Sequence, residues 1–221
     1  YALDQYLTWQ YVPSPLTAFA GVSKLPPAHF LICRADGALK IERYWSPPQP
    51  RQSHAAPEAL ADELLARLTE AVRMRLISDV PLGAFLSGGI DSSAIVALMA
   101  QMSGKPIKTF TIGFEEQSFD ERPYARLLAD RYKTEHHEFL VKPDAAEVLP
   151  LLVRHYNEPF ADSSALPTYY VSKMTRQHVT VALSGDGGDE SFAGYDRYAH
   201  ILRWSLADMA PGFARQATCG A

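Results

Sequence analysis

Short apolar segments alternate with longer amphipathic segments from about residue 80 to residue 184, and this alternation limits the possible folds more than any other feature. The segments of strand length read VPLGAFL, IKTFTIGF, EHHEFLV and VTVALS. The segments of helix length read SSAIVALMAQM, DERPYARLLADRY, DAAEVLPLLVRHY and ALPTYYVSKMTRQH. Strands that alternate with helices predict βαβ units. The expected fold class is therefore α/β, with a parallel sheet and helices on both faces.

The part of the chain before this alternation has a different character. Residues 1–45 contain short apolar segments broken by Pro and Gly, and an Asp-Gly pair separates HFLIC from LKIERYW. That arrangement predicts a β-hairpin, so we expect small, antiparallel β structure here. The proline-rich residues 46–57 are expected to form an interdomain linker. Residues 58–221 would then form the α/β domain, which opens with a helix whose apolar residues are Leu60, Leu64, Leu65, Leu68, Val72 and Leu76.

Composition excludes several classes of protein. The chain has 221 residues, of which 47% are hydrophobic, and this suits one full domain plus a piece of another. A net charge of −4 argues against nucleic acid as a partner, and no apolar run is long enough to span a membrane. The two cysteines, Cys33 and Cys219, form no zinc motif and indicate reduced thiols in a cytoplasmic protein.

The sequence SGGIDSS, directly after the first predicted strand, has the features of an anion-binding loop. Gly88 and Gly89 can adopt backbone angles that other residues avoid, and successive N–H groups in such a turn form a concave anion site. The helix expected to begin near Ser92 adds its positive end, and Ser92 itself is a candidate N-cap. Further hydroxyl donors are Ser87 and Ser93. Because Asp91 would repel a phosphate, the loop predicts a Mg²⁺ ion between them.

Other interpretations of this loop are an ordinary Gly-rich turn, a Walker A loop and a dinucleotide-binding turn. No GxxxxGK[ST] or GxGxxG pattern is present, which disfavours the last two. The strand before the loop and the helix after it favour an anion site over an ordinary turn.

A second polar cluster, SGDGGDE, follows the last predicted strand. Ser184 and Gly185 end the strand, and carboxylates follow at Asp186, Asp189 and Glu190. A solvated acidic loop is the simplest interpretation of such a cluster. However, the carboxyl ends of parallel strands form the ligand-binding edge of an open sheet. We therefore expect the two loops to face each other across one nucleotide, with Mg²⁺ bound by carboxylates.

Taken together, these motifs resemble the glutamine-hydrolysing asparagine synthetase family, whose synthetase domain belongs to the PP-loop ATP pyrophosphatases. The resemblance covers essentially the whole chain and rests on the segments YLTWQYVPSP, KLPPAHF, ERYW, DVPLGAFLSGGIDSS, TFTIGF followed by FDE, EPFADSSALPTY and VALSGDGGDESFAGYDRY. It implies a Rossmann-like fold of the PP-loop type for residues 58–221, truncated at its C-terminus. It also implies that residues 1–45 are the end of an N-terminal glutaminase domain.

The resemblance implies an amide-forming ligase that adenylates aspartate with ATP and transfers glutamine-derived ammonia to it. ATP and Mg²⁺ are the implied cofactors, small molecules are the implied partners, and a homodimer is left open. By motif position, the implied metal ligands are Asp91 and Asp189, and Asp186 and Asp189 take the catalytic positions. The implied ATP contacts are Leu86, Ser87, Gly88, Gly89, Asp91, Ser92, Ile112, Ser184 and Gly185.

Two positions depart from the family pattern. Asp186 stands where Glu is common, at a position tied to the adenylate, and Ala28 stands where the family has Gly in LPPGH. The first departure leaves open a relative that amidates another carboxylate, such as those linked to exopolysaccharide or exosortase systems. A PP-loop enzyme that acts on tRNA is disfavoured by the acidic charge. A module that binds ATP without turnover also stays open, because the chain is expected to be an inactive fragment by itself.

The segment FADSSA contains a further candidate group, Asp162, Ser163 and Ser164. These residues match a family segment near the aspartate or intermediate site. A simple helix N-cap would explain the same residues, and the sequence does not decide between the two interpretations.

Overall fold

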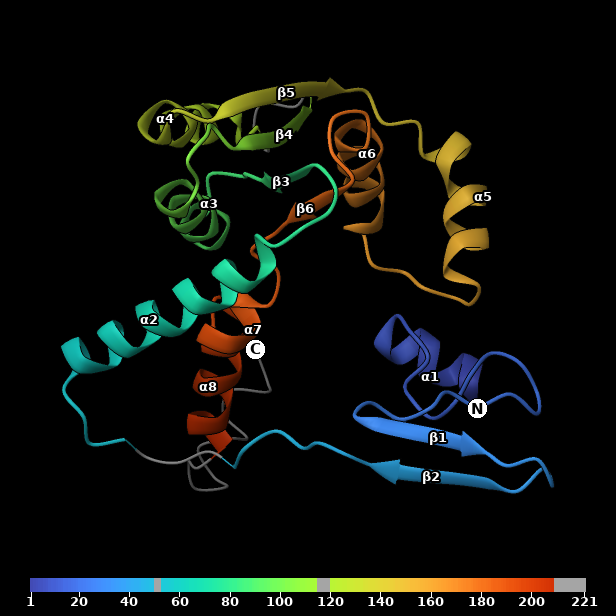
Figure 1. The fold of residues 1–221 in the computed structure, drawn as a ribbon. Coiled ribbons are helices and arrows are strands. Elements are labelled where there is room, and N and C mark those ends of the chain that lie inside the picture. The colour runs from blue at the N-terminus through green and yellow to red at the C-terminus, as the bar shows by residue number, and fades with distance from the viewer. Residues whose placement is uncertain (50–52, 115–119, 209–221) are drawn as a thin grey trace. The chain divides into compact units, whose positions relative to one another are not determined.

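A computed structural model describes residues 1–49, 53–114 and 120–208 (Figure 1). Cys219 and the end of the predicted α/β domain lie outside the described residues, as does Phe119 of the FDE motif. The chain divides into two compact units. The described residues of the first unit are 1–49, 53–68, 114 and 140–174. Those of the second unit are 69–113, 120–139 and 175–208. This division cuts through helix α2 (Pro57–Arg75). The expected domain boundaries at residues 45 and 57 therefore stay a prediction.

The second unit is built on a parallel sheet with the strand order β5-β4-β3-β6. Its strands are β3 (Leu82–Phe85), β4 (Lys108–Phe114), β5 (Glu135–Val141) and β6 (Val181–Leu183), although the last residue of β4 and the last two of β5 are assigned to the first unit. On β3, Ala84 pairs in parallel with Thr109 of β4 and with Leu183 of β6. The predicted α/β class and the parallel sheet are confirmed.

Both faces of this sheet are covered, as expected. Helix α3 (Ile90–Met102) contacts β3 and α4 (Arg122–Tyr132), and Arg126 of α4 forms an ion pair with Glu138 of β5. On the opposite face, the His178 ring beyond α6 (Ala165–Thr175) lies 4.2 Å from the ring of His137. Neighbouring residues of a strand point to opposite faces of the sheet. The contact of His137 with His178 and the contact of Glu138 with Arg126 therefore lie on opposite faces of β5.

The strand order contains a reversal that locates the ligand-binding edge. From β3, the chain adds β4 and β5 on one side and later adds β6 on the other side. In open α/β sheets, ligands bind at such a switch point, outside the carboxyl ends of the strands. The switch point lies between β3 and β6, the two strands that the SGGIDSS and SGDGGDE loops follow.

The first unit contains the predicted hairpin. Strands β1 (His29–Cys33) and β2 (Leu39–Arg43) pair antiparallel around a turn in which Gly37 has φ +83°. The loop after α5 (Ala145–Tyr156) joins this unit, because the Ala161 N–H donates to the Gln10 carbonyl at 2.9 Å.

The expectation of β structure throughout residues 1–45 is wrong at its start. Residues Ala2–Trp9 form helix α1, which buries none of its side chains. Leu3, Tyr6 and Leu7 have helical spacing, and this short pattern was the signal for the helix. The Pro and Gly residues that indicated strands and turns begin only after Tyr11.

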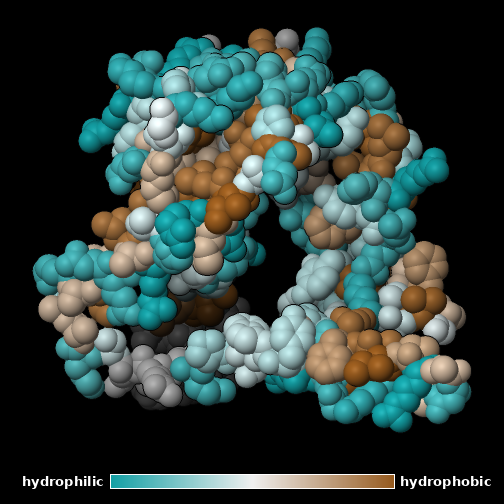
Figure 2. Space-filling view, viewed as in Figure 1, coloured by the Kyte–Doolittle hydropathy of each residue, from teal (hydrophilic) through white to brown (hydrophobic). Residues whose placement is uncertain are grey.

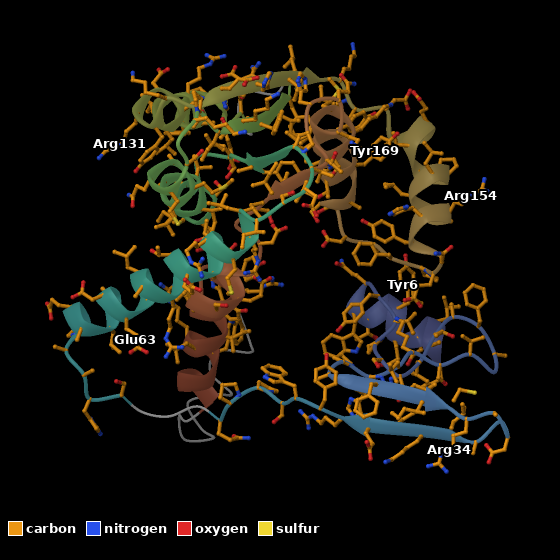
Figure 3. All side chains as sticks on the ribbon, in the orientation of Figure 1. Tyr6, Arg34, Glu63, Arg131, Arg154 and Tyr169 are labelled. Atoms are coloured by element: carbon orange, nitrogen blue, oxygen red, sulfur yellow. The ribbon has the colours of Figure 1, made fainter. Side chains whose placement is uncertain are left out.

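Several apolar side chains remain at the surface of the first unit. Phe30, Leu31 and Ile32 on β1 are 39–45% exposed, and apolar residues gather over this strand (Figure 2). Leu64 on α2 is 37% exposed, whereas the charged Glu63 beside it points outward (Figure 3). No helix among the described residues is both long and apolar enough to cross a membrane.

Candidate functional site

The loop after β3 turns at a glycine that the surrounding structure requires. Gly88 has φ +86°, a conformation that L-residues with side chains rarely adopt. A Cβ atom at this position would lie 2.5 Å from Tyr124 Cβ and 2.9 Å from Ala125 N. The first turns of α4 therefore form a wall against the loop. The sequence interpretation missed Tyr124 and Ala125, because only the fold brings α4 beside Gly88.

Serine hydroxyls hold the loop from inside. Ser92 Oγ accepts a hydrogen bond from the Ser87 N–H at 3.2 Å and lies 2.9 Å from Ser87 Oγ. Ser92 is 8% exposed, so these contacts are largely protected from water. Ser93 Oγ donates to the Gly89 carbonyl at 2.5 Å. The loop is therefore ordered by its own side chains.

The prediction that Ser92 caps the helix is wrong. Helix α3 begins at Ile90, Gly89 is its N-cap, and no side chain caps it. The Ser93 N–H donates to the Gly89 carbonyl at 3.1 Å, which makes it the first N–H with a partner one turn back. The N–H groups of Ile90, Asp91 and Ser92 come earlier in the helix and therefore have no carbonyl partner within it. An uncapped helix start of this kind suits an anion.

The loop after β6 packs directly onto the loop after β3. A Cβ at Gly185 would lie 2.6 Å from Ser92 N and 2.8 Å from the Asp91 carbonyl carbon. A Cβ at Gly188, the first residue of α7 (Gly188–Phe192), would overlap the Asp91 carboxylate. The structure therefore brings the two predicted loops together, through positions where only glycine leaves room.

The carboxylates of the two loops differ in environment. Asp91 and Asp189 are half-buried, whereas Asp186 is exposed and accepts a hydrogen bond from Ser184 Oγ at 2.9 Å. Among the described residues, Asp91 has no hydrogen-bond or ion-pair partner for its carboxylate. Asp91 therefore remains available for a cation.

Glu190 has a partner of its own. It accepts a hydrogen bond from the Tyr195 hydroxyl at 2.7 Å, and this bond lowers the pKa of the Glu190 carboxyl. Glu190 therefore already has a hydrogen-bond donor, unlike Asp91.

The donor set fits a Mg²⁺ ion that is shared with a substrate. The described parts of the chain contain no group of three or more His, Cys, Asp or Glu side chains arranged to hold a metal. Mg²⁺ commonly uses one or two protein carboxylates, with phosphate oxygens and waters as its other ligands. The Asp91 carboxylate, which lies against Gly188 and has no partner in the described part of the chain, is the feature that suits such an ion.

The two residues expected near adenosine lie differently. Leu86 is 1% exposed, and its N–H donates to the Phe110 carbonyl at 2.9 Å while its carbonyl accepts from Thr111 Oγ1. Ile112 on β4 is half-buried. Ile112 is therefore the more accessible of the two, and the contact of Leu86 with a nucleotide stays a prediction.

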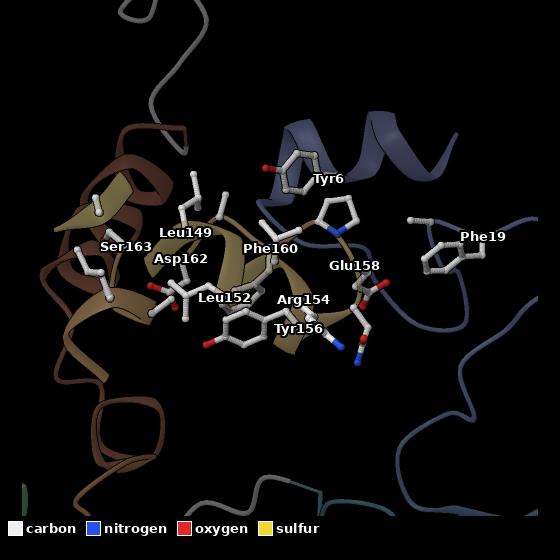
Figure 4. A pocket seen from close by; sticks show the side chains of 18 residues that line it. Tyr6, Phe19, Leu149, Leu152, Arg154, Tyr156, Glu158, Phe160, Asp162 and Ser163 are labelled. Carbon is white, nitrogen blue, oxygen red and sulfur yellow. The ribbon is translucent and has the colours of Figure 1, made fainter. Parts of the chain in front are cut away.

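The FADSSA segment lies in the first unit, beside a cavity of about 870 Å³ (Figure 4). Asp162 and Ser163 line this cavity together with aromatic side chains such as Tyr156 and Phe160, whose rings lie 4.5 Å apart. The Asp162 carboxylate accepts from the Ser164 N–H at 2.8 Å, just before α6. This bond fits the structural interpretation of the segment, and a substrate role stays a prediction.

Comparison with known proteins identifies relatives across the chain. The family model for asparagine synthase matches residues 63–219. A Bacillus subtilis protein named glutamine-hydrolysing asparagine synthetase 1 is 39% identical over 95% of the chain, which covers 33% of that relative. A Methanocaldococcus jannaschii protein, provisionally named a glutamine-hydrolysing asparagine synthetase, is 39% identical over 97% of the chain, which covers 42% of it. The chain thus spans less than half the length of either relative.

Among solved structures, an NMN synthetase from Francisella tularensis aligns with a TM-score of 0.40 and 18% identity. The alignment covers 64% of this chain and 59% of that one.

Proposed function

Because the chain belongs to the asparagine synthase family, we propose that it carries the nucleotide site of an ATP-dependent, amide-forming ligase. The whole protein would adenylate aspartate and pass glutamine-derived ammonia to it, which gives asparagine, AMP and pyrophosphate. The observation that supports this best is the packing of Gly185 and Gly188 onto Ser92 and Asp91 at the switch point of the sheet.

In this proposal, the backbone of the loop after β3 binds the phosphates of ATP. Gly88 turns the chain at the site, and the uncapped start of α3 would offer the N–H groups of Ile90 and Asp91 to a phosphate. The N–H groups of Ser87 and Gly89 already donate to the hydroxyls of Ser92 and Ser87 and keep the loop ordered. Asp91 and Asp189 would hold Mg²⁺, whose chemical contribution is to neutralise phosphate charge. Ser92 keeps the loop in shape rather than acting as a nucleophile.

The chemistry needs no protein nucleophile. An oxygen of the substrate carboxylate attacks the α-phosphorus of ATP, and pyrophosphate leaves with the bonding electron pair. Ammonia then attacks the acyl carbon, a proton is lost, and AMP leaves. The uncapped N–H groups at the start of α3 would stabilise the negative charge that develops on the phosphates. Asp186, which lies on the exposed side of the second loop, is proposed to act near the adenylate.

Aspartate-dependent exchange of labelled pyrophosphate into ATP tests the proposal in the intact protein. We expect exchange in the wild type and a loss of about a hundredfold or more in Asp91→Asn, because the variant keeps the shape but loses the charge for the cation. Asp36→Asn in the hairpin turn is the matched control and should exchange normally. Full exchange in Asp91→Asn would contradict the assigned role.

A second candidate function is amidation of a different acid, and the position of Asp186 supports it. Asp186 is one methylene shorter than the common Glu and folds back onto Ser184 Oγ, so its reach into the site is short. Exchange that depends on another carboxylic acid, and not on aspartate, would favour this candidate. Binding of MgATP without any exchange would instead favour a module that binds ATP without turnover.

A further inference from the structure

The wall that supports the loop after β3 belongs to one helix, α4. Gly88 is in contact with the backbone of Tyr124 and Ala125, and Ala125 is 0% exposed. Because no side chain separates Gly88 from this backbone, a shift of α4 would either remove this contact or push Gly88 out of its place. The position of α4 on the sheet therefore determines the position of the loop.

Two arginines of the same helix form forked ion pairs, Arg122 with Asp120 just before the helix and Arg126 with Glu138 on β5. Arg122 donates two hydrogen bonds to Asp120, at 2.7 and 2.8 Å. Its stem lies against Gly113 near the end of β4, where a Cβ would come within 2.6 Å of Arg122 Cδ. Arg126 donates two hydrogen bonds of 2.5 Å each to Glu138 on β5. The second pair links α4 to a different strand, with the geometry that makes Arg–carboxylate contacts directional.

Glu138 is well placed to anchor the helix. Its side chain is 20% exposed, and the hydrogen bond from Arg126 is the main cause that lowers the pKa of its carboxyl. His136 Nε2 lies 3.4 Å from the same carboxylate. Removing Arg126 would leave a partly buried carboxylate without its main partner, so α4 would lose its cross-link to the sheet.

We infer that α4 is a positioning element for the phosphate loop and that the Arg126–Glu138 pair fixes its place on β5. In this inference, Arg126 and Glu138 act on the loop through Tyr124 and Ala125, which lie against Gly88, and not by direct contact with the nucleotide. This inference rests on the proposed function, in which the loop binds the phosphates of ATP.

Calorimetric titration of the intact protein with MgATP, and separately with adenosine, tests the inference. Arg126→Gln and Glu138→Gln should each weaken MgATP binding by about tenfold, because a small misplacement of a binding element is costly. Adenosine binding should stay nearly unchanged, which separates loss of the phosphate loop from general damage to the fold. The double variant should be no weaker than either single variant, as expected for residues that act as one pair.

The matched control is Arg73→Gln, which breaks the similar forked pair with Glu70 on α2. The control should bind MgATP like the wild type. Unchanged MgATP binding in Arg126→Gln and Glu138→Gln would overturn the inference, and so would an equal loss of adenosine binding. If the variants unfold, Arg126→Lys should keep the charge and show an intermediate loss that is still confined to MgATP. A wild-type protein that binds no MgATP would instead overturn the proposed function, and this inference with it.

Discussion

The loops after β3 and β6 have the same residue types but different physical states. The loop after β3 is tied by Ser87, Ser92 and Ser93 and is walled by α4. The loop after β6 has an exposed Asp186 and open space around Gly187. The first loop is held by hydroxyl contacts around the buried Ser92, whereas the side-chain hydrogen bonds of the second loop involve the exposed carboxylates of Asp186 and Glu190. A preorganised loop suits phosphate binding, because donors that are already in place need no reorganisation when charge develops.

The left-handed glycines of the two loops give the largest expected difference. Gly88 and Gly187 have φ +86° and +90°, but only Gly88 has neighbours where a Cβ would lie. Gly88→Ala combines backbone strain with overpacking and should cost about 2–5 kcal/mol of unfolding free energy. Gly187→Ala suffers the strain alone and should cost about 1–2 kcal/mol. Urea unfolding followed by circular dichroism measures the unfolding free energy of both variants. Equal losses of unfolding free energy would show that α4 moves away from the new methyl group at little cost.

Gly188 tests whether the second loop depends on the first. A methyl group at residue 188 would displace the Asp91 carboxylate, so Gly188→Ala should lower pyrophosphate exchange by about a hundredfold. Gly187→Ala, next to it, should reduce exchange far less because its methyl group meets nothing within 4 Å. Similar exchange in the two variants would show that the contact between Gly188 and Asp91 does not matter for the reaction.

The sequence allowed much of this arrangement to be predicted. The alternation of segments fixed the α/β class, and the carboxyl-end rule brought SGGIDSS and SGDGGDE to one edge of the sheet. These predictions succeed because strand and helix periodicity are local properties. The two loops then meet because the strands they follow, β3 and β6, are neighbours in the sheet.

Other features depend on contacts that local patterns do not encode. Ser92 is typical of an N-cap, but the turn at Gly88 and Gly89 lets α3 begin earlier, so the hydroxyl bonds to Ser87 instead. The wall at Tyr124 arises only when α4 folds back onto the sheet.

A smaller difference is expected between the two serines that stabilise the loops. Ser92→Ala removes the acceptor for the Ser87 N–H in a largely buried position and should cost about 1–3 kcal/mol of unfolding free energy. Ser184→Ala removes a bond to the exposed Asp186 and should change stability by less than about 0.5 kcal/mol. Urea unfolding of both variants checks this ranking. A larger loss in Ser184→Ala would reverse the assignment of the rigid loop.

Ala28 allows the free-energy cost of a left-handed backbone to be measured alone. In Gly88→Ala, the same backbone cost comes together with a steric clash against α4. Ala28 has φ +59°, at the position where the family pattern has Gly, and its carbonyl accepts from the Tyr44 N–H at 2.9 Å. Ala28→Gly removes the steric strain of the left-handed conformation but increases the entropy of the unfolded chain. A net gain of about 0.5–1 kcal/mol is expected in urea unfolding. A gain of this size would give the free-energy cost of an alanine in the left-handed conformation, which is the cost expected in Gly187→Ala. Any further loss of unfolding free energy in Gly88→Ala would then come from the clash of the new methyl group with α4. No gain, or a loss, would mean that the left-handed conformation costs little at Ala28. The stability losses at Gly88 and Gly187 could then not be compared through backbone conformation alone.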